Sequence, residues 1–318
     1  MIFRLICLAS LLLSQSVLAF GFKSHPKSKP YQSIQKNEAV SKYTEILVNG
    51  NIDLRLRTGF SKSGVFLRGD KRDLDFVKFL VKDGALTLHV ANGHPKYGPL
   101  SAELRTRYLN GFEYHGKGAI SGHKLRANLV DLFIDNAGKT SLKGTIRLNR
   151  LRVIGKGETE INGVVSPMLH VKLSDAARLK LSGMARIRTI DMEGDSWFSL
   201  LWVKSTSMRV RLRDNAFLQL AGIANKVDAK VAGHARFNAR YLRARRAFVK
   251  TCDNAVAEIV ATRHQHTLAT DSSDIRFYKL PKMKTDFMAL DGSILDMRAL
   301  NSPLVEEPTI YNKGVAQG

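Results

Sequence analysis

The strongest constraint on the fold is a short motif that recurs along the chain at an almost constant interval. In each copy a turn-like aspartate leads into alternating apolar residues, as in RDNAFLQLAG over residues 213–222. The four copies begin at Asp135, Asp175, Asp214 and Asp253, roughly 40 residues apart each time. A fixed period of this kind predicts a solenoid, in which each repeat packs only against its neighbours.

A second series falls between these copies, at Gly157, Asp195, His234 and Asp274, so the repeating unit has about 20 residues. Segments such as RVRLR alternate with a period of two, which excludes helical repeats, and no unit keeps the leucine-rich-repeat frame. We therefore predict an all-β protein, a right-handed parallel β-helix whose turns stack about 4.8 Å apart.

The recurrence has a structural explanation. Aspartate at a corner can hydrogen-bond a tight bend and tolerates a left-handed backbone, so Asp135, Asp175, Asp214 and Asp253 are predicted to form a turn ladder. Small residues follow at the same turn, namely Ala137, Ala177, Ala216 and Ala255. An apolar ladder inside the helix is predicted from Leu142, Leu181, Leu220 and Ile259.

The ends of the chain differ in composition from the repeats. Residues 1–19 combine a basic start, a short apolar run and a small-x-small site at Ala19, which predicts a cleaved signal peptide and an exported protein. Residues 20–44 are rich in Lys, Ser and Pro and are predicted to be a flexible basic lead-in. Residues 281–318 lose the repeat and are predicted to be an irregular cap or tail.

Residues 45–92 alternate as antiparallel strands do, and we expect two-residue hairpin turns at Asn49-Gly50 and Asp83-Gly84. A short helix is an alternative only at 73–78. This stretch has Gly69-Asp70 and Leu74 ahead of the Asp83-Gly84 turn, and β-helix turns follow it. In this order of features the chain resembles the head GIN domain family over residues 45–280. The resemblance implies an adhesin-like surface protein and brings no catalytic motif.

Charge suggests the partner. The chain has 50 Lys and Arg against 28 Asp and Glu, a net charge of +22, which attracts polyanions. Lys172, Arg211 and Lys250 recur at the same interval as the aspartate motif and should stack in one column. The predicted polyanion-binding residues are Lys172, Arg209, Arg211, Arg213, Arg236, Arg240, Arg243, Arg245, Arg246 and Lys250. Guanidinium rows suit phosphates and carboxylates; the alternative is a solvated face that blocks edge pairing.

We therefore predict an exported, non-enzymatic surface protein that binds lipopolysaccharide, an acidic glycan or a host surface, with nucleic acid less favoured. It would act in the periplasm, on the outer-membrane surface or after secretion. No cofactor or metal is predicted, and the sequence gives no oligomeric state. The alternative is a carbohydrate-active enzyme, a polysaccharide lyase or hydrolase, which would need Asp195, Asp214 and an arginine in one deep groove.

Four smaller features also have a structural explanation beside a functional one. His264 and His266 share a strand face, but we favour structural histidines over a metal pair. Arg68-Gly69-Asp70 is a tripeptide that some adhesins present to receptors, a role we do not favour here. Trp197 and Trp202 are expected to pack rather than form a sugar platform, and Cys252 to be a buried structural thiol.

Overall fold

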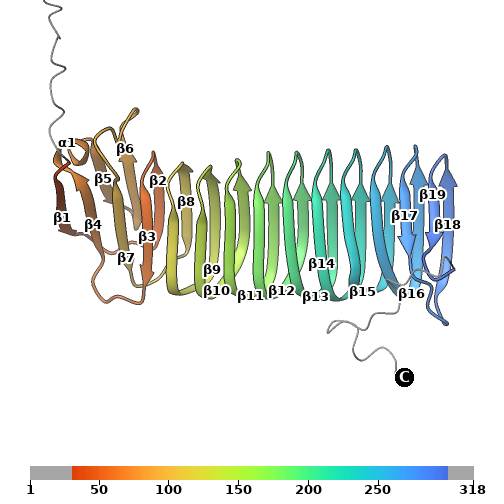
Figure 1. The fold of residues 1–318 in the computed structure, drawn as a ribbon. Helices are drawn as coiled ribbons and strands as arrows, with labels where there is room; N and C mark the ends of the chain where they lie inside the picture. Colours follow the sequence, from red (N-terminus) through yellow and green to blue (C-terminus); the bar gives the residue numbers. More distant parts are fainter. Residues whose placement is uncertain (1–30, 300–318) are drawn as a thin grey trace, which may run out of the picture. The chain divides into compact units, whose positions relative to one another are not determined.

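The computed structural model describes residues 31–299, and its body is a β-solenoid built from eight long strands. These strands are β9 (Ile120–Asn136), β10 (Thr140–Ile154), β11 (Glu158–Leu173), β12 (Arg178–Met192), β13 (Trp197–Leu212), β14 (Phe217–Val231), β15 (Arg236–Thr251) and β16 (Val256–Thr270). Each pairs in parallel with its neighbours in sequence, and Figure 1 shows them as bent arrows stacked side by side along one axis. The predicted parallel β-helix of short turns is confirmed.

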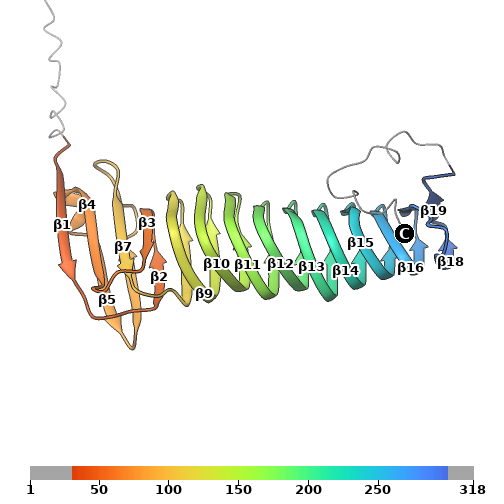
Figure 2. The same ribbon diagram turned by 90° about the horizontal axis from the view of Figure 1, so that it is seen from below.

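Each long strand forms one complete coil because it bends near its middle. The register between neighbouring strands shifts there, as between Lys143 and Arg150 in β10. The residues before the bend form the first limb and those after it the second limb, and a tight turn then leads to the next coil. The two limbs build two facing sheets, which run side by side along the axis of the solenoid (Figure 2).

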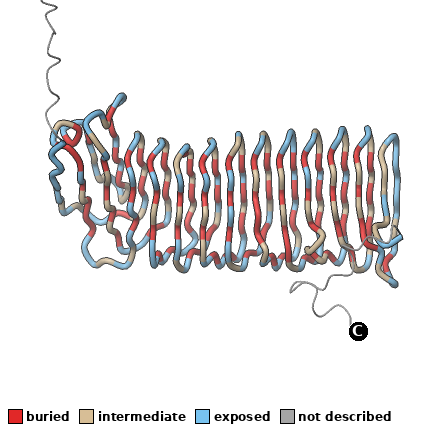
Figure 3. Tube along the Cα trace, viewed as in Figure 1, coloured by how far each residue is buried: buried red, intermediate tan, exposed pale blue. Residues whose placement is uncertain are grey.

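Alternate side chains of both limbs point between the sheets and form a continuous apolar core, seen as repeated buried segments in Figure 3. The predicted inner ladder is confirmed, since Leu142, Leu181, Leu220 and Ile259 are at most 3% exposed. This period-two burial follows from the alternation of side chains along a strand, and it explains why the sequence alternates.

The coils alternate in length, which explains why the aspartate motif recurs at every second coil. From the register, equivalent turn positions are held by Asn136, Gly155, Asp175, Gly194, Asp214, Gly233 and Asp253. The coils that begin at Gly155, Gly194 and Gly233 are one residue longer than the others and place the extra residue at the bend. The true structural unit is therefore a pair of coils.

Glycine and aspartate alternate at this turn position for a physical reason. All but Asn136 have positive φ angles, from 59° to 93°, a region that glycine and aspartate tolerate. A Cβ at Gly194 would lie 2.5 Å from the Asp175 carbonyl oxygen, so only glycine fits there. The Oδ2 atom of Asp214 in turn accepts a hydrogen bond of 2.9 Å from the Gly194 N–H, and Asp253 does the same for Gly233.

The structure corrects one member of the predicted turn ladder. Asp175, Asp214 and Asp253 occupy the turn position, but Asp135 lies one residue earlier, within β9, and pairs with Ile154. The turn position of that coil belongs to Asn136, whose side-chain oxygen accepts from the Gly138 N–H at 2.8 Å. Ala137 is displaced in the same way and is exposed, whereas Ala177, Ala216 and Ala255 are fully buried.

The N-terminal end of the solenoid is a head that extends both sheets. Its elements are β1 (Ser33–Ala39), β2 (Glu45–Asn49), β3 (Asp53–Thr58), β4 (Gly64–Asp70), α1 (Lys71–Leu74), β5 (Val77–Lys82), β6 (Ala85–Val90), β7 (Ser101–Thr106) and β8 (Gly111–Gly116). The first-limb sheet continues through β3, β7, β4 and β1, and the second-limb sheet through β8, β2, β6 and β5.

The head is a mixed structure rather than the predicted antiparallel segment. The Asp83-Gly84 hairpin is confirmed, with positive φ at both residues and β5 antiparallel to β6. The Asn49-Gly50 hairpin is wrong, because β2 and β3 do not pair; β2 joins β6 and β8 in the second-limb sheet, and β3 joins β7 and β9 in the first. That turn crosses between sheets, as the coil turns do.

The described part of the predicted lead-in, residues 31–44, contains a strand. Residues 33–39 form β1, which is antiparallel to β4 and covers the outer edge of the first-limb sheet. Tyr43 is buried, and its hydroxyl donates to the Arg105 carbonyl oxygen at 2.9 Å; burial raises the pKa of this phenol. The sequence did not indicate β1 because this strand is almost wholly exposed and so lacks an apolar pattern. The predicted signal peptide lies outside the described residues.

Residues 281–299, which were predicted to belong to an irregular cap or tail, contain two strands. Strands β17 (Asp274–Phe277) and β19 (Ser293–Asp296) extend the first-limb sheet, and β18 (Lys284–Leu290) extends the second-limb sheet beside β16. Strand β18 is mostly exposed, which explains why its apolar alternation is weak in the sequence. Residues 300–318 lie outside the described range.

Candidate functional site

One outward-facing column of the second-limb sheet is rich in basic residues, and we call it the basic column. It consists, one residue per coil, of Arg152, Lys172, Asp191, Arg211, Lys230 and Lys250. Its members lie about 4.8 Å apart from coil to coil. The predicted stacking of Lys172, Arg211 and Lys250 is therefore correct, while their role in binding stays a prediction.

The five cations of the basic column are exposed, and none forms an ion pair with any residue from 31 to 299. Asp191 is the one acid, and it lies 3.5 Å from the guanidinium of Arg213. Arg152 and Lys230 were missed by the sequence analysis, which followed the spacing of the aspartate motif only. They stand one coil before Lys172 and Lys250, so a search at the spacing of a single coil would have found them.

Two open hollows, of about 420 and 400 Å³, lie at the C-terminal half of the basic column. Lys230 and Lys250 line both hollows, and Phe248 and Phe287 line the second. The Phe248 ring stacks on His266 with 4.7 Å between ring centroids. Cations next to aromatic rings can hold both the charge and the apolar face of an acidic sugar.

The other predicted polyanion-binding residues are distributed over different surfaces. Arg209 lies in the neighbouring outward column of the second-limb sheet, and Arg213 is held by Glu193 at 2.8 Å. Arg236 belongs to the first-limb sheet, next to Phe217 of the preceding coil. The remaining four, Arg240, Arg243, Arg245 and Arg246, all lie at the bend of β15. The structure therefore does not bring the ten residues into one site.

The edge formed by the turns is where the enzyme alternative has to be judged. A hollow of about 560 Å³ there is lined by Asp135, Asp175 and Asp195 together with Lys117 and Lys156. Asp214 is not among the lining residues, and its carboxylate accepts from the Gly194 N–H. Asp195 lines the hollow and accepts from the Asn215 amide at 2.7 Å. Asp195, Asp214 and an arginine are thus not gathered in this hollow.

Two of the smaller features make contacts within the described structure. The His264 and His266 rings are stacked, with 6.4 Å between centroids, and His266 Nδ1 lies 2.7 Å from Asp286. No cluster of three or more His, Cys, Asp or Glu side chains suited to a metal ion occurs among residues 31–299. Asp70, at 2% exposure, caps α1 by accepting from the Arg72 N–H, so Arg68-Gly69-Asp70 is not displayed to a receptor.

The two tryptophans differ in burial, and the cysteine is less buried than predicted. Trp197 is half-buried and stacks on Phe217, whereas Trp202 is 63% exposed, contrary to the expectation that both would pack. Cys252 is only partly buried; burial and the neighbouring Asp253 raise the pKa of its thiol, which favours the unreactive protonated form.

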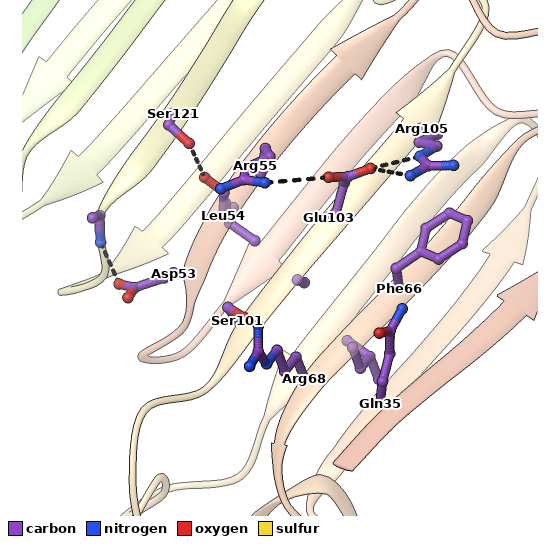
Figure 4. Close-up of a pocket in the computed structure, with 13 residues that line it drawn as sticks. Gln35, Asp53, Leu54, Arg55, Phe66, Arg68, Ser101, Glu103, Arg105 and Ser121 are labelled. Atoms are coloured by element: carbon purple, nitrogen blue, oxygen red, sulfur yellow. Dashed lines mark hydrogen bonds and ion pairs between the residues drawn. The ribbon is translucent and has the colours of Figure 1, made fainter. Parts of the chain in front are cut away.

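The head contains a further cleft, of about 440 Å³, over β1, β4, β7 and β3 (Figure 4). Arg55, Arg57 and Arg105 converge on the carboxylate of Glu103, at 3.7, 3.5 and 2.5 Å. The Arg105 guanidinium also lies over the Phe66 ring, 4.1 Å from its centroid. The alternating arginines of DLRLR in β3 could have indicated this cluster. Because Glu103 already occupies it, we attribute to it a role in fixing the head strands.

The stacked coils define the class of this protein by its fold, a β-solenoid. Within that class, the model of the family described as "Putative auto-transporter adhesin, head GIN domain" matches residues 42–198 and 163–281, so the chain belongs to the head GIN domain family. Within residues 31–299, no helix has the length and apolar character that crossing a membrane requires.

Several solved structures are similar to this chain. A "putative adhesin" from Parabacteroides merdae is 14% identical, with a TM-score of 0.45, over 83% of this chain and 97% of that one. A "putative adhesin" from Parabacteroides distasonis is 16% identical, with a TM-score of 0.43, over 83% and 96%. A "putative lipid binding protein" from the same species is 14% identical, with a TM-score of 0.39, over 83% and 97%. No curated protein matches the chain.

Proposed function

We propose that this protein is an exported, non-enzymatic surface-binding protein that holds an anionic polysaccharide, that of lipopolysaccharide included, along its basic column. The observation that carries the proposal is the row of Arg152, Lys172, Arg211, Lys230 and Lys250, which are exposed and form no ion pair within residues 31–299. Membership of an adhesin-type family and the predicted signal peptide support an envelope or extracellular location. The engaged carboxylates of the turn edge favour binding over carbohydrate chemistry.

Regular spacing favours a polymer over a small anion. Neighbouring cations along the column are one or two strand spacings apart, about 5 or 10 Å, so a chain with repeated charges can contact several of them at once. Each additional contact on the same chain is intramolecular, so weak single contacts add to a tight complex. The Phe248 and His266 rings beside Lys250 favour a sugar polymer over a bare polyphosphate.

The test is binding of the mature chain to heparin, lipopolysaccharide and DNA across a salt series. We expect the anionic polysaccharides to bind more tightly than DNA and the affinity to fall steeply with salt, because cation–polymer contacts release counterions. Lys230→Gln with Lys250→Gln should weaken binding and lower the salt slope by roughly one unit per lysine.

Lys156→Gln with Lys117→Gln, on the turn edge, removes the same charge elsewhere and should change binding much less. Equal losses in the two double variants would show that only net charge matters, and absence of binding at low salt would overturn the proposal.

A further inference from the structure

The edge formed by the bends differs in composition from the rest of the solenoid, and we call it the bend edge. It comprises residues 124–129, 143–149, 162–168, 182–188, 201–207, 221–226, 240–246 and 260–264. These segments contain thirteen Lys or Arg and no Asp or Glu: Lys124, Arg126, Lys143, Arg147, Arg186, Arg188, Lys204, Lys226, Arg240, Arg243, Arg245, Arg246 and Arg263. The turn edge, formed by the turns between successive coils, has by contrast seven acids: Asp135, Asp175, Glu193, Asp195, Asp214, Asp253 and Asp271.

The same edge holds the exposed apolar side chains of the solenoid body. From residue 116 to 252, the exposed large apolar residues are Leu129, Val165, Met168, Met184, Trp202 and Ile223, and all six lie on the bend edge. Their exposed fractions run from 42% to 63%. Exposed apolar residues scattered singly need no explanation, but their concentration on one edge indicates a contact surface.

The central apolar residues come from consecutive coils. Val165 of β11 pairs directly with Met184 of β12. Trp202 of β13 follows beside Met184, since the next residue, Val203, pairs with Ala185. Ile223 of β14 pairs with Lys204 of β13. Val165, Met184 and Trp202 therefore lie side by side along the axis, and Ile223 lies on the next coil beside Lys204, two residues after Trp202. We call these four side chains the apolar ridge.

Trp202 is outside because of the way the longer coils hold their extra residue. Leu200 pairs with Leu220 and Val203 with Gly222, so β13 bulges by one residue at Leu201-Trp202. The residue of β12 beside Trp202 is Met184, and Gly222 of β14 pairs with the next residue, Val203. Relative to β14, Trp202 therefore lies in the bulge, where its ring is 63% exposed.

We propose that the bend edge binds the surface of an anionic lipid leaflet, with Trp202 and its apolar neighbours entering the headgroup–acyl boundary and the flanking cations contacting the headgroups. Apolar insertion together with basic residues is the combination by which peripheral proteins hold anionic membranes. Tryptophan is the residue enriched at that boundary. A straight edge of stacked coils also fits a flat surface along its length.

Charge and exposed apolar surface favour an anionic lipid leaflet over a second copy of the chain or a soluble polyanion. A second copy of the chain docking through the same edge would place two acid-free, basic surfaces against each other, which is repulsive. A soluble polyanion would satisfy the cations but leave the apolar ridge in water. The surface is separate from the basic column, so this proposal does not depend on the proposed polysaccharide contact.

The chain offers a direct spectroscopic test because it has only two tryptophans. In a Trp197→Phe background, Trp202 emission is recorded with vesicles of phosphatidylcholine alone and with vesicles containing a quarter phosphatidylglycerol. We expect a blue shift and quenching by brominated lipids only with the anionic vesicles. Binding to them without a change in Trp202 emission, equal binding to neutral vesicles, or a blue shift that follows protein concentration without lipid would each overturn the proposal.

Variants separate insertion from adsorption. Met184→Ser, Trp202→Ser and Ile223→Ser together should lower partitioning into anionic vesicles at least tenfold, because insertion is lost. Heparin binding should be unchanged, because the basic column is intact. Leu80→Ser, at an equally exposed position on β5, is the matched control and should have no effect. An unchanged partition of the triple variant would contradict the proposal even if the protein still binds polysaccharide.

Discussion

Asp214 occupies a backbone conformation that most residues avoid, with φ of 59°, and its carboxylate joins two coils through the Gly194 N–H. Both features come from one small side chain, which explains why aspartate recurs at this turn. Larger residues would meet the steric cost of the left-handed region without supplying the acceptor.

Asp214→Ala should therefore lower the free energy of unfolding by about 2 kcal/mol, from the lost hydrogen bond and the strained backbone together. Asp214→Asn, which tolerates this conformation and keeps an oxygen acceptor, should cost less than half as much. Urea unfolding of the three proteins measures both differences. Equal midpoints for alanine and asparagine would show that the turn position does not determine coil stability.

Asp73 supports the head in a similar way. It is fully buried at the end of α1, and its carboxylate accepts from the backbone N–H groups of Lys96 and Tyr97 at 2.9 and 2.8 Å and contacts His94 at 2.9 Å. Burial alone would raise the pKa of Asp73, but these hydrogen bonds lower it below the usual value. The residue thus fixes the segment between β6 and β7.

A depressed pKa gives a definite pH dependence. The stabilisation by Asp73 is fully present above its unfolded pKa, about 3.9, and is lost as the pH falls through the lower folded value. At pH 7, Asp73→Asn should cost about 1–3 kcal/mol, and the difference from the native protein should shrink towards pH 3. Urea midpoints between pH 7 and pH 3 test this; a gap that stays constant would mean that charge is not involved.

At the scale of the elements, the sequence predicted the repeating strands because their buried side chains alternate. It could not fix the phase of the turn, since Asp135 and Asn136 are both good turn residues and only the register selects Asn136. The Asn49-Gly50 turn has the local chemistry of a hairpin, yet β2 and β3 find partners far along the chain. A turn dipeptide therefore does not predict which distant strands will pair.

The candidate surfaces were predictable to different degrees. The stacking of Lys172, Arg211 and Lys250 follows from spacing alone, because equal spacing gives equal position in a solenoid. The bend edge was not predictable in the same way: which residues face outward at a bend depends on where the one-residue bulge of each longer coil lies. Trp202 is the clearest case, since a tryptophan among apolar residues is ordinarily expected to be buried.

The whole molecule depends on the alternation of longer and shorter coils. Removing residues 175–213 deletes one Asp coil and one Gly coil, and places Asp214 next to the Gly155 coil in the position that Asp175 held. Removing residues 175–193 deletes a single coil and brings two Gly coils together, so that the Gly155 N–H loses its carboxylate acceptor.

We therefore expect the larger deletion to be the milder one. The protein lacking 175–213 should unfold cooperatively with a urea midpoint close to that of the native chain, because solenoid stability is set by contacts between neighbouring coils. The protein lacking 175–193 should show a clearly lower midpoint or a broadened transition. Circular dichroism in urea measures both, and the reverse order would contradict a two-coil unit.

This pairing of coils also limits how such a gene can change its length. A duplication or loss that copies a single coil breaks the glycine–aspartate alternation at the junction, whereas one that copies two preserves every turn and every bulge. Lengthening by pairs extends both outer surfaces by the same step and leaves their pattern intact. Among related genes, we expect insertions and deletions within the repeats to come in multiples of two coils.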